Sequence, residues 1–223
     1  MVFLLQKKLI EIDNFPRVRQ SAAMDFKELN RWRRANKNYD PRHKIDHATI
    51  LRIIDEAVLA PSSMNMQGTK VIAVVSEEER KRLHGVAWKQ QQILDASAVL
   101  IILGNHHAYK NVQYIYEQSQ GVPAEVVKTM VGYAENLYAK DVQKQRDEAL
   151  RSSSLFAMTT MLAAANEGYA SCPMGGFDAE GVSREFGIHH PYFPVMLISL
   201  GKQSQVPFVR PYRYSASEIT NFR

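Results

Sequence analysis

The chain contains the run Ala98-Val99-Leu100-Ile101-Ile102-Leu103, in which no polar residue interrupts the apolar side chains. A short run of this kind is typical of a strand that is covered on both faces of a sheet. Two other runs share its character, Val71-Ile72-Ala73-Val74-Val75 and Val195-Met196-Leu197-Ile198-Ser199-Leu200. The sequence therefore predicts a sheet with buried strands at these three places.

Helices are predicted in the long segments between these strands. A short helix is expected from Asp25 to Trp32, and Asp46 can cap the next helix, which stops at Pro61. The segment 155–165 is small or apolar on nearly every face, so we expect a helix that is buried on all sides, which suggests a subunit interface. Helices around separated, buried strands predict an α+β fold.

Length and composition limit the class of protein. A chain of 223 residues with 45% hydrophobic content can bury a sizeable core, and no linker divides residues 25–223. We therefore expect one domain over 25–223, and an N-terminal extension over 1–24 that need not be ordered. The first ten residues make a poor signal peptide.

Cysteine content and charge limit the compartment and the partners. The single cysteine, Cys172, cannot form an intrachain disulfide, and no apolar run approaches the roughly 20 residues of a membrane-spanning helix. A cytoplasmic location with no membrane partner is the simplest expectation. The net charge of +5 is spread over scattered basic residues, so we expect no nucleic-acid binding.

Two basic segments stand near the ends of the predicted domain. Arg33-Arg34-Ala35-Asn36-Lys37 places three cations within one turn-forming segment, a spacing that can converge on a single phosphate. Its alternative interpretation is a solvated basic turn, which this segment alone favours because such clusters are common on surfaces. Arg210-Pro211-Tyr212-Arg213 either supplies a distant phosphate cation or decorates a solvated tail.

Two polar segments adjoin core elements in the middle of the chain. Ala60-Pro61-Ser62-Ser63-Met64-Asn65-Met66-Gln67-Gly68 offers hydroxyl and amide groups suited to the ribityl chain or polar edge of a flavin, or it is an ordinary turn. Cys172-Pro173-Met174-Gly175-Gly176-Phe177-Asp178 contains paired glycines that permit close backbone approach to a planar ring. The alternative for the latter is a strand-to-helix connection capped by Asp178.

In this order, the four segments resemble the FMN-dependent nitroreductase family from about Phe26 to Ile219, including its bacterial NAD(P)H nitroreductases. The resemblance rests on Arg33-Arg34-Ala35-x-Lys37-x-Tyr39, on Ala60-Pro61-Ser62-Ser63-x-Asn65-x-Gln67, on Gly168-Tyr169-x-x-Cys172-Pro173-Met174-Gly175-Gly176-Phe177, and on Pro194-Val195-Met196-Leu197-Ile198-Ser199-Leu200-Gly201 with Arg213 beyond. It implies a central mixed β-sheet surrounded by helices, in an intertwined homodimer.

The resemblance also implies which residues bind FMN. It assigns the phosphate and neighbouring polar atoms to Arg33, Arg34, Lys37 and Arg213, and a loop from the partner subunit to Ser62, Ser63 and Asn65. The loop Met174-Gly175-Gly176 is expected to run beside the isoalloxazine and place a backbone N–H near N5. The full implied set is Arg33, Arg34, Ala35, Lys37, Pro61, Ser62, Ser63, Asn65, Gln67, Pro173, Met174, Gly175, Gly176 and Arg213.

The sequence departs from the family pattern in three places. Ala35 stands where many relatives have Ser, which removes one phosphate hydrogen bond, and Gly175 stands where some have Glu. Gly68-Thr69 replaces the common Pro-Trp, so packing under the flavin edge is expected to differ.

The implied activity is an FMN-dependent oxidoreductase. NADH or NADPH would give hydride to flavin N5 and a small acceptor, such as a nitroaromatic or a quinone, would then take it by a ping-pong mechanism, with no catalytic acid, base or nucleophile from the protein. Two alternatives stay open: another reduction on the same scaffold (dehalogenation, enal or aldehyde reduction, flavin breakdown), and a flavin-binding sensor or store without turnover. No metal site is predicted, because His106-His107 and His189-His190 lack carboxylates or thiols at metal-ligand spacing.

Overall fold

The computed structural model describes residues 25–207 and 209–223, so the predicted extension over 1–24 lies outside the described residues. Its sheet has four strands in the order β1-β2-β4-β3. The strands are β1 (Lys70–Val74), β2 (Ala98–Asn105), β3 (Ala170–Met174) and β4 (Tyr192–Gly201). The three strands expected from the apolar runs are therefore confirmed, and β3 was not predicted.

All three strand pairs are antiparallel. The resemblance implies a mixed sheet. In the described part of the chain, the only parallel pairing is an isolated bridge between Ala35 and Ser171. The sheet is thus antiparallel with a single parallel bridge at its β3 edge, while the α+β class is confirmed. All eight residues of β2 are buried, which agrees with a strand covered on both faces.

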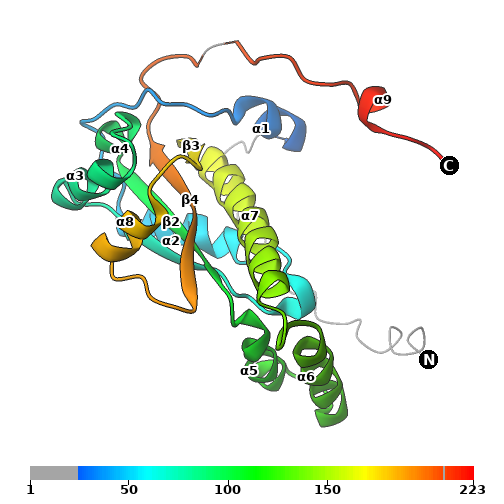
Figure 1. Cartoon of the computed structure of the whole chain (residues 1–223). Coiled ribbons are helices and arrows are strands. Elements are labelled where there is room, and N and C mark those ends of the chain that lie inside the picture. Colours follow the sequence, from blue (N-terminus) through cyan, green and yellow to red (C-terminus); the bar gives the residue numbers. More distant parts are fainter. Residues whose placement is uncertain (1–24, 208) are drawn as a thin grey trace.

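Helices cover both faces of the sheet and extend beyond it (Figure 1). Asp46 and Ser76 accept backbone N–H bonds at two helix starts, from Thr49 at 2.7 Å and from Glu79 at 3.2 Å. The described helices are α1 (Phe26–Trp32), α2 (His47–Ala57), α3 (Glu77–Val86), α4 (Gln92–Asp95), α5 (Asn111–Gln118), α6 (Ala124–Tyr138), α7 (Val142–Asn166), α8 (Ala179–Glu185) and α9 (Ala216–Ile219). Two short 3₁₀ turns, η2 (Ser63–Asn65) and η3 (Ala108–Lys110), complete them.

The alternation of side chains along β2 divides the interior into two cores. Val99 and Ile101 point into a core shared with α3, α4 and α8, whereas Leu100 and Ile102 point into a core shared with α2 and α7. Figure 1 shows the same division, with α3, α4 and α8 on one side of the sheet and α7 on the other. The α2 helix ends at Ala57, short of the predicted Pro61 boundary, because residues 58–60 form a turn.

Two parts of the chain project from this body. The helices α5 and α6 lie beyond one end of the sheet around a small core of their own that includes Met66, Val112 and Tyr138 (Figure 1). The C-terminal arm, residues 209–223, runs along the opposite end and then away from the body. Among the described residues, no helix combines the length and the apolar character needed to cross a membrane.

The α7 helix is buried on one side in the single chain. Phe156, Ala157 and Ala164 are buried against the sheet, while Leu155 is 48% exposed. The predicted burial on every face therefore does not hold within one subunit. Leu155, Met158 and Leu162 form an open apolar strip on α7, which the rest of the chain covers only in part.

Candidate functional site

The basic segment after α1 lies along the β3 edge of the sheet. Ala35 forms the parallel bridge to Ser171, and the Asn36 N–H donates to the Ser171 carbonyl at 3.0 Å. The Tyr39 hydroxyl donates to the Ser199 carbonyl at 3.1 Å, and burial raises the Tyr39 pKa well above its ordinary value, so the donor proton is retained. These bonds fix the basic segment to the edge of the sheet.

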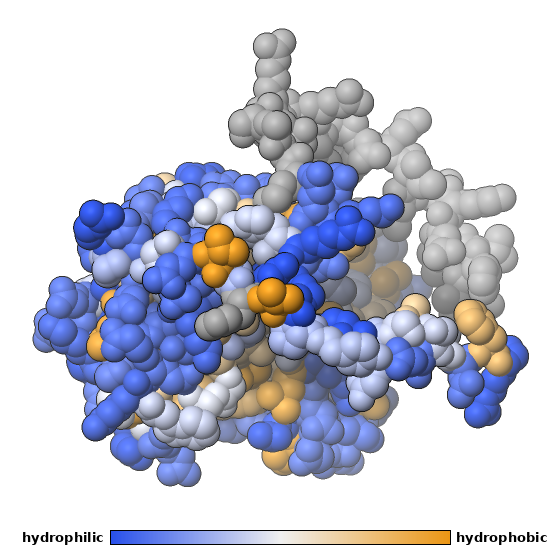
Figure 2. Space-filling view, turned by 90° about the horizontal axis from the view of Figure 1, so that it is seen from above, coloured by the Kyte–Doolittle hydropathy of each residue, from blue (hydrophilic) through white to orange (hydrophobic). Residues whose placement is uncertain are grey.

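The basic segment and the C-terminal arm together enclose a cavity of about 630 Å³. We call it the basic cavity; its described lining is Arg33, Arg34, Ala35, Asn36, Lys37, Asn38, Pro207, Val209, Arg210, Pro211 and Arg213. None of these lining residues is acidic. Figure 2 views the molecule from this end and shows strongly hydrophilic residues beside isolated hydrophobic ones along the arm.

The basic cavity combines concentrated positive charge with buried donors from Arg33 and Asn36. The pKa of Arg33 is lowered first by burial and then by the charges of Arg210 and Arg213. Within the described chain, Arg33 Nε and Asn36 Nδ2 are buried and have no hydrogen-bond partner. Concentrated positive charge with unused donors fits a phosphate group, because charge-assisted bonds to phosphate are stronger than neutral ones.

Arg210 was not among the predicted site residues, although it lies only three positions before Arg213. Its Nη2 donates to the carbonyls of Arg31 and Arg33, each at 3.0 Å, at the end of α1. A guanidinium there satisfies carbonyls that a helix end leaves free. Arg210 therefore ties the C-terminal arm to the basic segment.

The glycine loop, residues 174–178, begins at the other end of β3. Ser171, which contacts the basic segment, and Met174 are three residues apart, or roughly 10 Å along a strand. A Cβ atom added at Gly175 would meet no atom within 4 Å, so this backbone faces open space. The basic segment and the glycine loop thus lie along the same edge of the sheet, which is formed by β3.

Cys172 lies on β3 between these two features. The residue is buried, and burial raises the pKa of its thiol. A protonated, buried thiol behaves as a small hydrophobe, which agrees with the interpretation of Cys172 as a packing residue.

The Ser62 loop, residues 61–68, lies away from the basic cavity in the same chain. It lines a separate hollow of about 90 Å³ with Ser152 and Phe156 of α7, and the two hollows share no residue. The α7 helix rises roughly 20 Å from Ser152 to Asn166, just before β3. Within one subunit, the basic segment, the C-terminal arm and the glycine loop therefore lie along the β3 edge, and the Ser62 loop lies apart from them.

The backbone of the Ser62 loop is unusual. Met64, Asn65 and Gln67 have φ angles of 49°, 52° and 46°, in the left-handed region that residues other than glycine rarely occupy. Ser62 Oγ accepts the Gln67 N–H at 3.0 Å and holds this shape. Strained backbone of this kind clusters at ligand-binding positions. The side chains of Asn65 and Gln67 are exposed, so their amide groups are accessible from outside this chain.

At Gly68 the Ser62 loop lies very close to η3. A Cβ atom at Gly68 would overlap the Cβ of Ala108 in η3. The loop therefore packs directly on η3, and any larger residue at position 68 would push the two segments apart.

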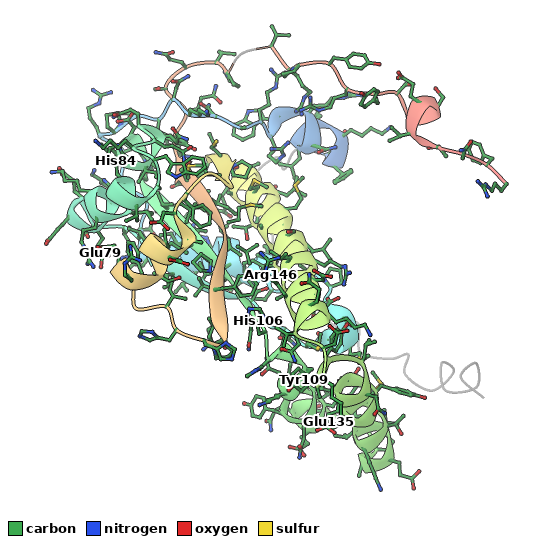
Figure 3. All side chains as sticks on the ribbon, in the orientation of Figure 1. Glu79, His84, His106, Tyr109, Glu135 and Arg146 are labelled. Atoms are coloured by element: carbon green, nitrogen blue, oxygen red, sulfur yellow. The ribbon has the colours of Figure 1, made fainter. Side chains whose placement is uncertain are left out.

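Three histidines gather at the end of the sheet near α6 and α7. The His107 and His190 rings are 4.7 Å apart, and the His106 and His190 rings are 5.9 Å apart. Burial first, and nearby positive groups second, lower the pKa of His106 and His107. Figure 3 shows His106 near Arg146 and Tyr109 at this end. In the described part of the chain, no group of His, Cys, Asp or Glu has an arrangement that could hold a metal ion.

Comparisons with known proteins agree with this architecture. The family model described as the nitroreductase family matches residues 31–202. The Bacillus subtilis protein named "Putative NAD(P)H nitroreductase MhqN" is 34% identical over 208 residues, covering 89% of this chain and 98% of the relative.

Two solved structures connect the fold with chemistry. A nitroreductase-type protein of Exiguobacterium sibiricum, solved in complex with FMN, superimposes with a TM-score of 0.85 at 31% identity, covering 92% of this chain and all of the other. An enone reductase of fatty acid saturation in gut bacteria superimposes with a TM-score of 0.80 at 25% identity, covering 89% of this chain and 97% of the other.

Proposed function

This chain belongs to the nitroreductase family, and we propose that residues 25–223 form one FMN-binding domain that uses NADH or NADPH to reduce a small organic acceptor. The observation that carries the proposal is the basic cavity beside the glycine loop on one edge strand. FMN has the matching parts, a phosphate and a planar ring. The FMN complex of the E. sibiricum relative supports the choice of cofactor.

We assign the phosphate to the basic cavity. Arg33, Arg34, Lys37 and Arg213 supply the charge there, and the backbone of Ala35 approaches without the hydroxyl that many relatives offer. Next to Pro173 and Met174, Gly175 and Gly176 supply backbone without side-chain bulk for the ring. Bound FMN supplies hydride acceptance and donation at N5, and the protein supplies binding, orientation and positive charge.

The functional unit that we propose is a homodimer. Within one chain, Pro61, Ser62, Ser63, Asn65 and Gln67 lie on the Ser62 loop, outside the basic cavity. A second copy related by a two-fold axis can place its Ser62 loop at the first copy's cofactor, and the same operation completes the other site. The open apolar strip of α7 offers a surface for that contact.

We expect nitroaromatics or quinones as acceptors. The chain needs no acid, base or nucleophile for this activity, because the cofactor carries the difficult electronics. Donor and acceptor would use one slot in turn, which gives ping-pong kinetics.

Enone reduction is the second candidate. It is favoured by the enone reductase of Lactiplantibacillus plantarum, which is 27% identical over 197 residues. Dehalogenation, aldehyde reduction, flavin breakdown and a flavin sensor or store remain further alternatives on this fold.

Anaerobic turnover with a panel of acceptors tests the proposal. NADH or NADPH should bleach the bound flavin, and a nitroaromatic or a quinone should restore its colour, with parallel double-reciprocal plots in steady state. Restoration by an enone alone would replace the first candidate with the second. A flavin that neither nucleotide bleaches would contradict both and leave a sensor or store.

A further inference from the structure

The turn between α3 and α4 is fastened to the glycine loop. Gln90 Nε2 donates to the Gly176 carbonyl at 2.7 Å, across 86 positions of sequence. The Asp178 N–H donates to the Val86 carbonyl at 2.9 Å. Gln92 Nε2, at the start of α4, lies 3.3 Å from Met174 Sδ, so the beginning, middle and end of the loop each have a partner in this turn or in the helix ends that flank it.

The turn adopts a conformation that its residues disfavour. Trp88 and Lys89 have φ angles of 53° and 51°, in the left-handed region. The Lys89 N–H donates to the His84 carbonyl at 3.1 Å and helps to hold this shape; Figure 3 labels His84 near the end of α3. Such backbone persists where the surroundings require it.

Trp88 closes one side of the glycine loop. Its side chain is 70% exposed, so core packing does not explain its position. A Cβ atom at Gly176 would lie 2.6 Å from Trp88 Cζ3, whereas one at Gly175 would meet nothing. The indole therefore covers the loop at Gly176 and leaves Gly175 open.

We propose that Gln90 is a positioning residue for the glycine loop, which it holds in the shape against which the FMN ring packs. The inference rests on the proposed function for its cofactor. Two adjacent glycines have wide conformational freedom, and an open Gly175 cannot restrict it by packing. The Gln90 amide removes that freedom by fixing the Gly176 carbonyl, and it is itself oriented by Gln92, whose Nε2 donates to Gln90 Oε1 at 2.9 Å.

If Gln90 orders the glycine loop before FMN binds, the affinity for FMN should be higher than it is without Gln90. A loop that is already ordered loses less conformational entropy when a ligand binds. Because the expected backbone N–H near N5 belongs to this loop, its placement also affects the stability of the reduced, negatively charged flavin.

Amide hydrogen exchange of the FMN-free protein tests the first half of this inference. In Gln90→Ala and in Gln90→Glu, which keeps the length but loses the amide N–H donor, exchange of the Asp178 N–H, which is bonded to the Val86 carbonyl, should accelerate about tenfold, the loss of one net hydrogen bond. Gln91→Ala is the matched control, because Gln91 donates to Asp95 at 2.8 Å on its own short helix. Wild-type exchange in both Gln90 variants would overturn the proposal.

FMN titration and redox potentiometry test the second half. Both Gln90 variants should bind FMN about tenfold more weakly and shift the midpoint potential of the bound flavin to more negative values, while Gln91→Ala matches the wild type. A lowered melting temperature with an unchanged potential would assign Gln90 a merely structural role and overturn the proposal. If the wild-type protein itself bound no FMN, the proposed function would fail, whereas the exchange result would still decide whether Gln90 holds the loop.

Discussion

Replacing Arg33 or Arg213 with alanine is expected to weaken FMN binding by about ten- to a hundredfold, because a hydrogen bond to a charged group contributes about 1.5–3 kcal/mol. Both residues line the basic cavity, and no described acidic residue in that lining compensates their charge. Burial lowers the pKa of Arg33, and a phosphate beside its guanidinium would favour the charged form. Fluorescence quenching of FMN on titration with each variant measures the effect.

Lys81→Ala is the matched control for these substitutions. Lys81 pairs with Glu77 at 2.7 Å, with both side chains largely exposed, so its removal changes the net charge equally but takes nothing from the lining of the basic cavity. Arg82 is a less clean control, because it bonds Glu185 of α8 and so joins two helices. Equal losses of affinity in the Arg33, Arg213 and Lys81 variants would show a general charge effect and no phosphate site.

Leu155→Glu is expected to separate the subunits and release FMN at the same time. Leu155 is 48% exposed on the open strip of α7, so one folded subunit tolerates a charge there. Two-fold pairing would bury the new charges in both copies, and each unpaired buried charge costs several kcal/mol. Loss of the second copy removes its Ser62 loop from the cofactor, which explains why FMN should leave.

Ala164 lies on the same helix but cannot serve as the probe. Its side chain is fully buried against its own sheet. A charge at Ala164 would therefore unfold the subunit and leave the interface untested.

Light scattering combined with flavin absorbance reads out the Leu155 experiment. Lys81→Glu introduces the same side chain on α3 and should leave both mass and flavin content unchanged. The idea of shared sites fails if Leu155→Glu, or the wild type, is a flavin-loaded, active monomer at micromolar concentration.

The strands that the sequence predicted are those with continuous apolar runs. The missed strand, β3, reads Ala170-Ser171-Cys172-Pro173-Met174, and its small and polar residues resemble a connection. Proline is tolerated there because β3 is an edge strand, where one side of the ladder has no partner. The first half of α7 was missed for a related reason, since buried polar residues such as Gln145 and Ser153 interrupt its apolar pattern.

The sequence predicted individual residues of the site better than it predicted how they lie relative to one another. Taken by themselves, Arg33 and Arg213 belong to two separate basic segments; the family resemblance assigns them to one phosphate, and the fold shows that they line one cavity. The resemblance also assigns the Ser62 loop to the partner subunit's site, whereas the bond between Gln90 and Gly176 could not be predicted, because it depends on tertiary packing. The histidine pairs show the same limit: His106 and His107 lie in a turn after β2, where they meet His190 from another loop.

Titration of the purified protein with FMN, followed by its visible spectrum, tests the central claim most directly. The account predicts a yellow protein that retains one FMN per subunit after gel filtration, with FMN as the only flavin released on denaturation. A colourless protein that fails to retain added FMN would contradict it.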